Sequence, residues 1–238
     1  MQTRRLDQML SRYGYCSRSE ARIWLRANRV TVNGEVAKAP DQKATPESVR
    51  IDGNPIECPD GLLALLNKPA GYVCSRDARE GPSIYELLPK QWSCRNPPVT
   101  SVGRLDKDTT GVLLVTDEGS LVQKWASPRG HVPKTYEVTV EPQFDPALID
   151  TFASGRLQLK GEDRPCLPAR LVIISPREAR VELTEGRYHQ VKRMFASQGY
   201  QVLRLHRSKF GEFHVDDLEP GQWRLLPIAH YLPFRSAK

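Results

Sequence analysis

The sequence lacks a long apolar run, so no part of its 238 residues forms a helix that could cross a bilayer. The first residues are polar and rich in arginine, with no apolar core behind them, which argues against a secretory signal. Internal repeats and low-complexity tracts are also missing. We therefore expect a cytoplasmic protein with no membrane partner, and a chain long enough to bury a full core.

Cysteine is scarce and scattered. The chain has five cysteines, Cys16, Cys58, Cys74, Cys94 and Cys166. They include no Cys-x-x-Cys pair, and they form no cluster with the five histidines. An odd and dispersed set indicates reduced thiols rather than a disulfide framework. We therefore expect no structural zinc.

Negative charge is in deficit, and the deficit is local. The chain has 35 Lys and Arg against 28 Asp and Glu, which gives 35 − 28 = +7. Residues 1–32 alone hold seven arginines against Asp7 and Glu20, which gives 7 − 2 = +5. Positive charge clustered at one end is typical of proteins that bind a polyanion, and it favours nucleic acid over a membrane surface.

Two short helices and a hairpin are predicted in residues 1–53. Apolar residues at helical spacing run from Leu6 to Tyr13 and end at Gly14. Further on, Asn33-Gly34 lies between alternating apolar residues and predicts a tight hairpin.

The second of these helices has a basic face. Ser17 followed by Glu20 fits a capping box that opens the helix. Its core-facing residues are predicted to be Ala21, Trp24 and Leu25. The opposite side carries arginines that would lie along a phosphate backbone: Arg18, Arg22, Arg26 and Arg29.

The remainder of the chain reads as a second domain. Residues 54–61 are rich in turn formers and lack periodicity, so we expect a short linker there and a second, larger domain over 62–238. Strands are expected at 62–66, 72–74, 112–115, 135–140, 169–174, 179–183, 201–205 and 213–215, and helices at 82–88, 120–126, 146–153 and 187–198. Consecutive strands lack regular helical crossovers, which predicts an α+β fold with a largely antiparallel sheet.

The most informative stretch is 102–119, where a tight polar loop adjoins a continuous apolar run. Gly103 precedes Arg104 and Asp106, and Gly111 ends the loop before a fully buried strand. This context would hold the Asp106 carboxylate rigidly at the mouth of a sheet, as a reacting carboxylate needs.

Three motifs in order resemble those of one family. GRLDKDTTG at 103–111 resembles the signature loop of the pseudouridine synthases, in particular the RsuA-like branch that isomerises uridines in ribosomal RNA. Lys134-Thr135-Tyr136 and EGRYHQVKRM at 185–194 resemble that branch's later motifs, and residues 1–53 resemble its S4 RNA-binding domain. The resemblance covers nearly the whole chain, and it implies that the largely antiparallel sheet of the second domain is mixed.

The resemblance implies catalytic roles for three residues and requires no metal or organic cofactor. Asp106 would be the carboxylate that acts at the sugar, either as a nucleophile or by stabilising a cationic sugar. Lys192, at a position where many relatives have Arg, would pair with Asp106 and keep it ionised. Tyr136 would stack on the target base and help to move a proton.

Other residues are expected to contact RNA. Arg104 should help to hold the target uridine flipped out of its stack. The helix from Arg187 is predicted to carry an apolar stripe of Tyr188, Val191 and Phe195, with His189 structural or in contact with RNA. The remaining expected RNA contacts are Arg4, Arg18, Arg22, Arg26, Arg29, Lys134, Arg187 and Arg193, the last two facing solvent or RNA. Gln8 stands where the family often has a lysine.

Several alternatives stay open at this point. The form of the 187–192 segment resembles the small-subunit members, which act on uridine 516 of 16S rRNA, and large-subunit enzymes are the runner-up. A non-catalytic S4-type assembly factor and a glycoside hydrolase that uses Asp106 with Asp108 are the rivals of other classes. We expect Asp108 to be a turn-capping residue peripheral to the site. Ribosomal RNA, free or in a partly assembled subunit, is the expected partner of a monomer.

Overall fold

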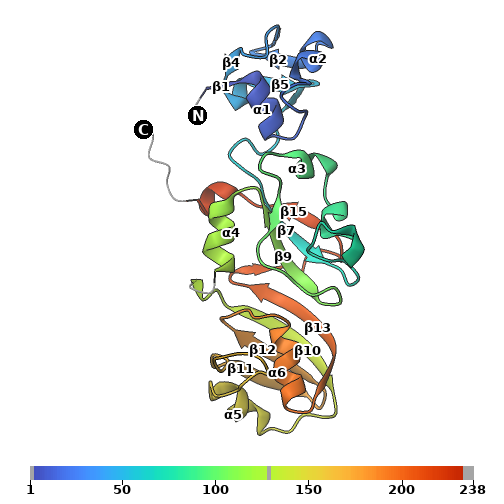
Figure 1. Cartoon of the computed structure of the whole chain (residues 1–238), viewed down its shortest axis with the longest axis vertical. Coiled ribbons are helices and arrows are strands. Elements are labelled where there is room, and N and C mark those ends of the chain that lie inside the picture. Colours follow the sequence, from blue (N-terminus) through green and yellow to red (C-terminus); the bar gives the residue numbers. More distant parts are fainter. Residues whose placement is uncertain (1–2, 128–129, 233–238) are drawn as a thin grey trace.

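The computed structural model describes residues 3–127 and 130–232. Figure 1 shows an elongated molecule, with the N-terminal part at one end and the two halves of a large sheet stacked below it. Within these described residues, every helix is too short or too polar to span a membrane.

The N-terminal part packs two helices on a small sheet. Helices α1 (Leu6–Arg12) and α2 (Ala21–Arg26) cover strands in the order β3-β2-β5-β6, and β1 (Arg4–Arg5) pairs with β4 (Lys43–Ala44). The strands of the small sheet are β2 (Val30–Val32), β3 (Glu35–Val36), β5 (Val49–Ile51) and β6 (Asn54–Pro55). The predicted hairpin is confirmed, since Asn33 and Gly34 join β2 to β3 with φ angles of 52° and 87°.

The predicted capping box is also present. Ser17 N donates to Glu20 Oε2 at 2.8 Å, and Glu20 N donates to Ser17 Oγ at 3.3 Å. The helix itself begins at Ala21, one residue after this turn. Ala21 and Leu25 are buried against the core, as expected from their spacing.

Residues 54–61 are more ordered than the sequence suggested. Asn54–Pro55 forms β6 on the edge of the N-terminal sheet, and Ile56 packs in the N-terminal core. The prediction that the linker begins at Asn54 is wrong, because a two-residue edge strand leaves no periodicity to detect. The exact division of the chain into domains stays a prediction.

The N-terminal part docks directly against α3 (Lys90–Cys94). Gln91 Nε2 donates to Tyr13 O at 3.0 Å, and Asn96 N donates to Arg12 O at 3.1 Å. A Cβ atom at Gly14 would lie 2.2 Å from Gln91 O. Glycine is therefore required at the point where the two parts meet, both for this close approach and for its φ of +79°.

A mixed sheet forms the rest of the molecule, in the order β11-β12-β10-β13-β9-β7-β15, with β8 on β9 and β14 on β13. Its strands are β7 (Leu63–Lys68), β8 (Thr100–Ser101), β9 (Thr110–Thr116), β10 (Lys134–Glu141), β11 (Arg170–Ser175), β12 (Glu178–Leu183), β13 (Gln201–Phe210), β14 (Phe213–His214) and β15 (Trp223–Leu225). All of these pairs are antiparallel except β9 with β13, which confirms the expected α+β class.

The parallel pair β9–β13 is the seam between the two halves of the sheet. Its register joins His206 to Thr110 and Arg207 to Gly111. A Cβ atom at Gly111 would lie 2.3 Å from Arg207 O, so only glycine permits this approach. The seam therefore begins at the last residue of the signature loop.

Both faces of the sheet are covered near the seam. Leu63 and Leu65 of β7 pack in a cluster with Trp125 of α4 (Gly119–Ala126), whereas Ala64 and Leu66 face the other cluster. Burial on both faces explains why β7 and β9 read as continuous apolar runs. On the C-terminal half, α5 (Leu148–Ala153) packs on β11 and α6 (Gln190–Ser197) on β13.

Some local predictions are wrong. Residues 72–74 form no strand but a single bridge between Val73 and Ser83. The helix expected from Arg187 begins at Gln190, because His189 adopts the left-handed conformation with a φ of 47°. Tyr188 therefore lies outside the helix and is 76% exposed rather than part of an apolar stripe. The predicted 82–88 helix is a short 3-10 turn, Ile84–Leu87.

Candidate active site

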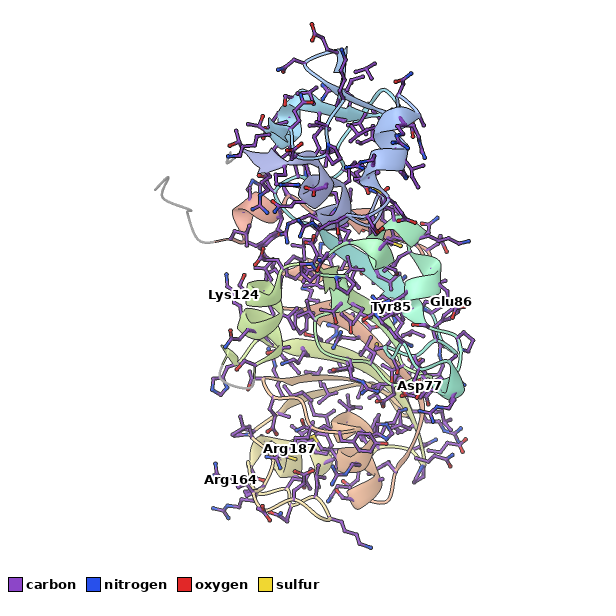
Figure 2. The ribbon with its side chains drawn as sticks, turned by 45° about the horizontal axis from the view of Figure 1, so that its top comes forward. Asp77, Tyr85, Glu86, Lys124, Arg164 and Arg187 are labelled. Atoms are coloured by element: carbon purple, nitrogen blue, oxygen red, sulfur yellow. The ribbon has the colours of Figure 1, made fainter. Side chains whose placement is uncertain are left out.

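A cavity of about 640 Å³ lies where the two halves of the sheet meet, between the signature loop and the N-terminal end of α6. Asp106 and Lys107 line it from one half, and Tyr136, His189 and Lys192 from the other. Figure 2 shows where the two halves lie: the labelled Asp77 and Tyr85 belong to the half that carries the signature loop, and Arg187, which lines the cavity, belongs to the other.

Asp106 is held between two basic side chains. Its Oδ2 lies 3.2 Å from Lys192 Nζ, and its Oδ1 lies 3.3 Å from His189 Nε2. The expected pairing of Asp106 with Lys192 is confirmed. The proximity of His189 was not expected, and its only sequence signal was its place inside the third motif.

Lys192 is shared with a second carboxylate. Its Nζ lies 2.5 Å from Asp108 Oδ1. Partial burial alone lowers the pKa of Lys192, but the two carboxylates outweigh it and raise that pKa above its usual value. The same contact overcomes the effect of burial on Asp108 and lowers the pKa of its carboxyl. The two-residue spacing thus brings both carboxylates to one ammonium, although the side chain of Asp108 is 74% exposed. That Asp108 is peripheral to the chemistry stays a prediction.

The signature loop rests on a buried lysine. Lys68 is 0% exposed, and its Nζ donates to three carbonyls, those of Pro69 at 3.1 Å, Lys107 at 3.2 Å and Thr109 at 2.8 Å. Burial lowers the pKa of Lys68 to about 8. The sequence analysis did not single out this residue, although a lysine directly after the apolar run expected at 62–66 was a usable signal.

Tyr136 forms part of the cavity wall and is 9% exposed. It lies in the middle of the sheet, opposite Val181 on β12 and Arg207 on β13. Lys134 is half-buried two residues before it, with its Nζ donating to Val132 O at 2.9 Å. Burial and then the charge of Arg207 lower the pKa of Lys134.

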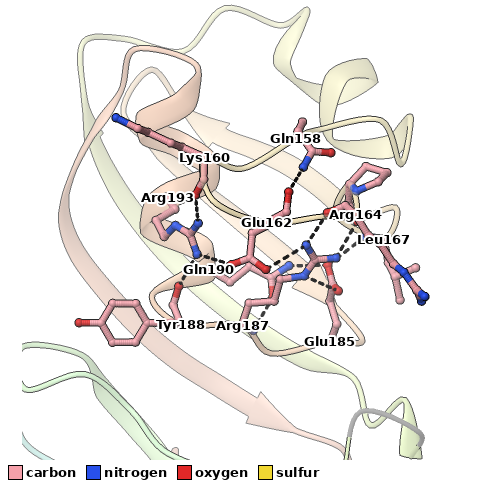
Figure 3. Close-up of polar contacts among 11 residues, drawn as sticks. Gln158, Lys160, Glu162, Arg164, Leu167, Glu185, Arg187, Tyr188, Gln190 and Arg193 are labelled. Carbon is pink, nitrogen blue, oxygen red and sulfur yellow. Dashed lines mark hydrogen bonds and ion pairs between the residues drawn. The ribbon is translucent and has the colours of Figure 1, made fainter.

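A polar network fixes the start of α6. Arg187 bonds to Glu185 and to the carbonyls of Arg164 and Pro165, and Arg193 bonds to Glu162 and to Lys160 O. Figure 3 shows this network and the Tyr188 ring pointing away from it. Arg187 and Arg193 were expected to face solvent or RNA, but their side chains are only 18% and 27% exposed because Glu162 lies between them. Their contact with RNA stays a prediction.

The other residues expected to contact RNA differ in their exposure and in whether a carboxylate lies near them. Arg104 is 73% exposed at the rim of the cavity, and its closest carboxylate contact is Glu80 at 3.8 Å. Arg4, Arg22 and Arg26 are exposed on the N-terminal part. Arg18 lies 3.6 Å from Asp7, and Arg29 pairs with Asp52 at 2.6 Å while covering the Trp24 ring.

The chemical groups of the site are carboxylates, amines, an imidazole and a phenol. Across residues 3–127 and 130–232, no group of three or more His, Cys, Asp or Glu side chains is arranged to hold a metal ion.

Comparison with known proteins identifies the two domains. Residues 63–197 match the RNA pseudouridylate synthase family, and residues 4–49 match the S4 domain family. Ribosomal small subunit pseudouridine synthase A of Yersinia pestis is 44% identical over 93% of this chain and 94% of its own length. The Escherichia coli (strain K12) protein of the same name is 42% identical over 93% of this chain and 96% of its own length.

Solved structures give the same assignment. A crystal structure of a pseudouridylate synthase superposes with a TM-score of 0.66 and 36% identity, over 95% of this chain and 97% of that one. The match extends over both domains and all three motifs. The chain therefore belongs to the RNA pseudouridylate synthase family and carries an N-terminal S4 domain, so it is a pseudouridine synthase.

Proposed function

We propose that this enzyme isomerises one uridine of small-subunit ribosomal RNA, uridine 516 of 16S rRNA. The relatives from Yersinia pestis and Escherichia coli are small-subunit synthases by name, and they align with this chain over 93% of its length. The ribosome is a cytoplasmic particle, so this substrate agrees with the expected location.

The observation that carries the catalytic assignment is the Asp106–Lys192 pair at the cavity. Conversion of uridine into pseudouridine breaks the bond from the sugar to the base nitrogen, rotates the base and rejoins it through carbon. Asp106 is the carboxylate that acts at the sugar, and Lys192, 3.2 Å away, supports its negative charge. Tyr136 supplies an aromatic wall for the base.

RNA binding is assigned mainly to exposed arginines. Arg22 and Arg26 are exposed on α2, and within residues 3–127 and 130–232 they have no carboxylate partner like those that hold Arg18 and Arg29. Arg104 lies at the rim, where it can reach the strand from which the target base is flipped. Arg187 and Arg193 contribute by positioning α6, because their donors are already used inside the protein.

The proposal is tested by mapping pseudouridine in ribosomal RNA from cells that lack this gene. We expect one site in 16S rRNA to lose its modification, the wild-type gene to restore it, and an Asp106→Asn gene to fail. Loss of a 23S site instead would show that the enzyme acts on the large subunit. Unchanged modification at every rRNA site would refute the ribosomal substrate.

A further inference from the structure

Arg207 is a buried cation that lines the cavity, and no carboxylate pairs with it among the described residues. Its Cζ lies 5.0 Å from the centroid of the Phe210 ring, which supplies no hydrogen-bond acceptor for the guanidinium in the plane of its donors. Arg207 is 3% exposed, and its Nε donates to Val112 O at 2.8 Å. Its Nη2 is enclosed and has no hydrogen-bond partner among the described residues. A buried donor without an acceptor costs free energy, so its retention points to an acceptor that comes from outside the chain.

The neighbours of Arg207 do not neutralise it. Lys134 is close enough for the charge of Arg207 to lower its pKa, so two cationic groups share this wall. Glu185 favours the charged form of Lys134, but its oxygens already accept from Arg187 and Gln190. The cavity that Asp106 lines therefore has in its wall a guanidinium donor, Nη2 of Arg207, that no described residue accepts from.

The position of Arg207 indicates that its acceptor is on the target base and not on a phosphate of the RNA. It lies opposite Tyr136 across β10 and β13, and its backbone touches Gly111 at the end of the signature loop. The exposed cations of the rim, such as Arg104, are where a phosphate would lie. A planar base attached to a sugar at Asp106 is the part of the substrate that reaches a residue buried this deeply.

The chemistry of uracil suits a fixed donor. The ring rejoins through carbon 5 after a half-turn about the axis through nitrogen 3 and carbon 6, and this half-turn exchanges the positions of the two carbonyls. A donor at one of these positions therefore meets a carbonyl oxygen before and after rotation. Cytosine would present its amino group there in one of the two orientations.

We propose that the Arg207 guanidinium donates to a carbonyl oxygen of the target uracil, holds the ring before and after its rotation, and selects uracil over cytosine. This inference rests on the proposed role of Asp106 at the sugar. It makes Arg207 a further substrate-contacting residue of the isomerisation.

The test replaces the target uridine in an RNA substrate by 2-thiouridine or by 4-thiouridine, because sulfur accepts hydrogen bonds more weakly than oxygen. Product is measured by nucleoside chromatography. For the wild type we expect both analogues to react about tenfold more slowly than uridine. In Arg207→Met, which is slower overall, we expect both penalties to shrink to about twofold.

Lys192→Arg is the matched control, because it slows turnover without touching the carbonyls and should keep the wild-type penalties. Penalties in Arg207→Met equal to those of the wild type would overturn the contact. If the wild type showed a penalty for only one analogue, Arg207 would not contact a carbonyl both before and after the base rotates. This result comes from the wild type alone, so it holds even if Arg207→Met does not fold. Should the wild type modify large-subunit RNA instead, the proposed substrate fails, and the same comparison is made on that RNA.

Discussion

The ammonium of Lys192 lies closer to Asp108, at 2.5 Å, than to Asp106, at 3.2 Å. The two carboxylates differ in exposure, since the side chain of Asp108 is 74% exposed and that of Asp106 is 24% exposed. Solvent therefore weakens the contact of Lys192 with Asp108 more than its contact with Asp106. We therefore regard Asp108 as a residue that positions Lys192 and Asp106 as the one that meets the substrate.

Asp106→Asn should abolish turnover and spare binding, because it removes the charge while keeping the shape. RNA with tritium at uracil carbon 5 releases it to water on isomerisation, and we expect no release. Affinity, measured on the same preparation, should change by less than about tenfold, or roughly 1.4 kcal/mol. Asp108→Asn is the matched control and should keep substantial turnover. An exchange of these two behaviours would contradict the assignment.

Lys192→Met should reduce the rate strongly, because both Asp106 and Asp108 lose their shared cation. Lys192→Arg should retain more activity, since a guanidinium keeps the positive charge. Single-turnover rates of the two variants on the same RNA make the comparison. Equal rates for Lys192→Met and the wild type would remove the ion pair from the mechanism.

Lys68→Met should loosen the signature loop, because the loop carbonyls of Lys107 and Thr109 lose their donor. A small displacement of Asp106 should cost about a hundredfold in rate. The measurement is single-turnover kinetics with RNA affinity determined in parallel. Affinity should change little, and an unchanged rate would show that the loop holds its shape without Lys68.

The same substitution has a signature in pH. The pKa of Lys68 falls from 10.5 to about 8 in the folded protein, so between these values the unfolded state binds more protons. Stability of the wild type relative to Lys68→Met should therefore rise with pH across this window, by at most about 3 kcal/mol. Denaturant unfolding of both proteins at several pH values measures it. A flat difference would mean that the folded protein does not lower the pKa of Lys68.

Gly14→Ala should weaken the docking of the N-terminal part, because the new Cβ meets Gln91 O at 2.2 Å. Gly34→Ala is the matched control, since Gly34 has a φ of +87° and no neighbouring atom of the described residues lies within 4 Å of such a Cβ. Strain at a positive φ should cost each variant about 1 kcal/mol, and the clash should cost Gly14→Ala about 1–3 kcal/mol more. Equal unfolding free energies for the two variants would show that the N-terminal part and α3 shift apart enough to relieve the clash with Gln91 O.

Replacing Arg22 and Arg26 together by Ala should flatten the salt dependence of RNA binding. Removing one contact to a phosphate reduces the slope of log K against log salt by about 0.7–0.9. The control replaces Arg177 and Arg180, which are also exposed but pair with Glu141 and Glu137 on the far part of the sheet. A slope that changes equally in both double variants would mean that α2 is not the RNA-binding face.

Sequence was most informative where burial or a motif left a strong pattern. Strands β7 and β9 are buried on both faces, so their continuous apolar runs predicted them. The loop that holds Asp106 was correctly predicted to adjoin β9. The Asp106–Lys192 pair came from the resemblance, because no periodicity relates residues on different halves of a sheet.

What sequence missed depends on tertiary contacts. The directions of Arg187 and Arg193 are set by Glu162, which lies on a loop with no pattern of its own. The late start of α6 follows from the left-handed His189, a conformation that sequence signals only weakly outside glycine and asparagine. Strands of two or three residues, such as β6 and β15, are too short for periodicity to register.

The seam between β9 and β13 has a consequence for the order in which the enzyme becomes competent. Asp106 precedes the seam on one half, while His189 and Lys192 arrive with the other half, later in synthesis. A nascent chain thus presents the carboxylate before its cation exists, and the two meet only when the last long strand closes the sheet. The ion pair at Asp106 therefore forms late, after the part of the chain that carries the carboxylate has been made.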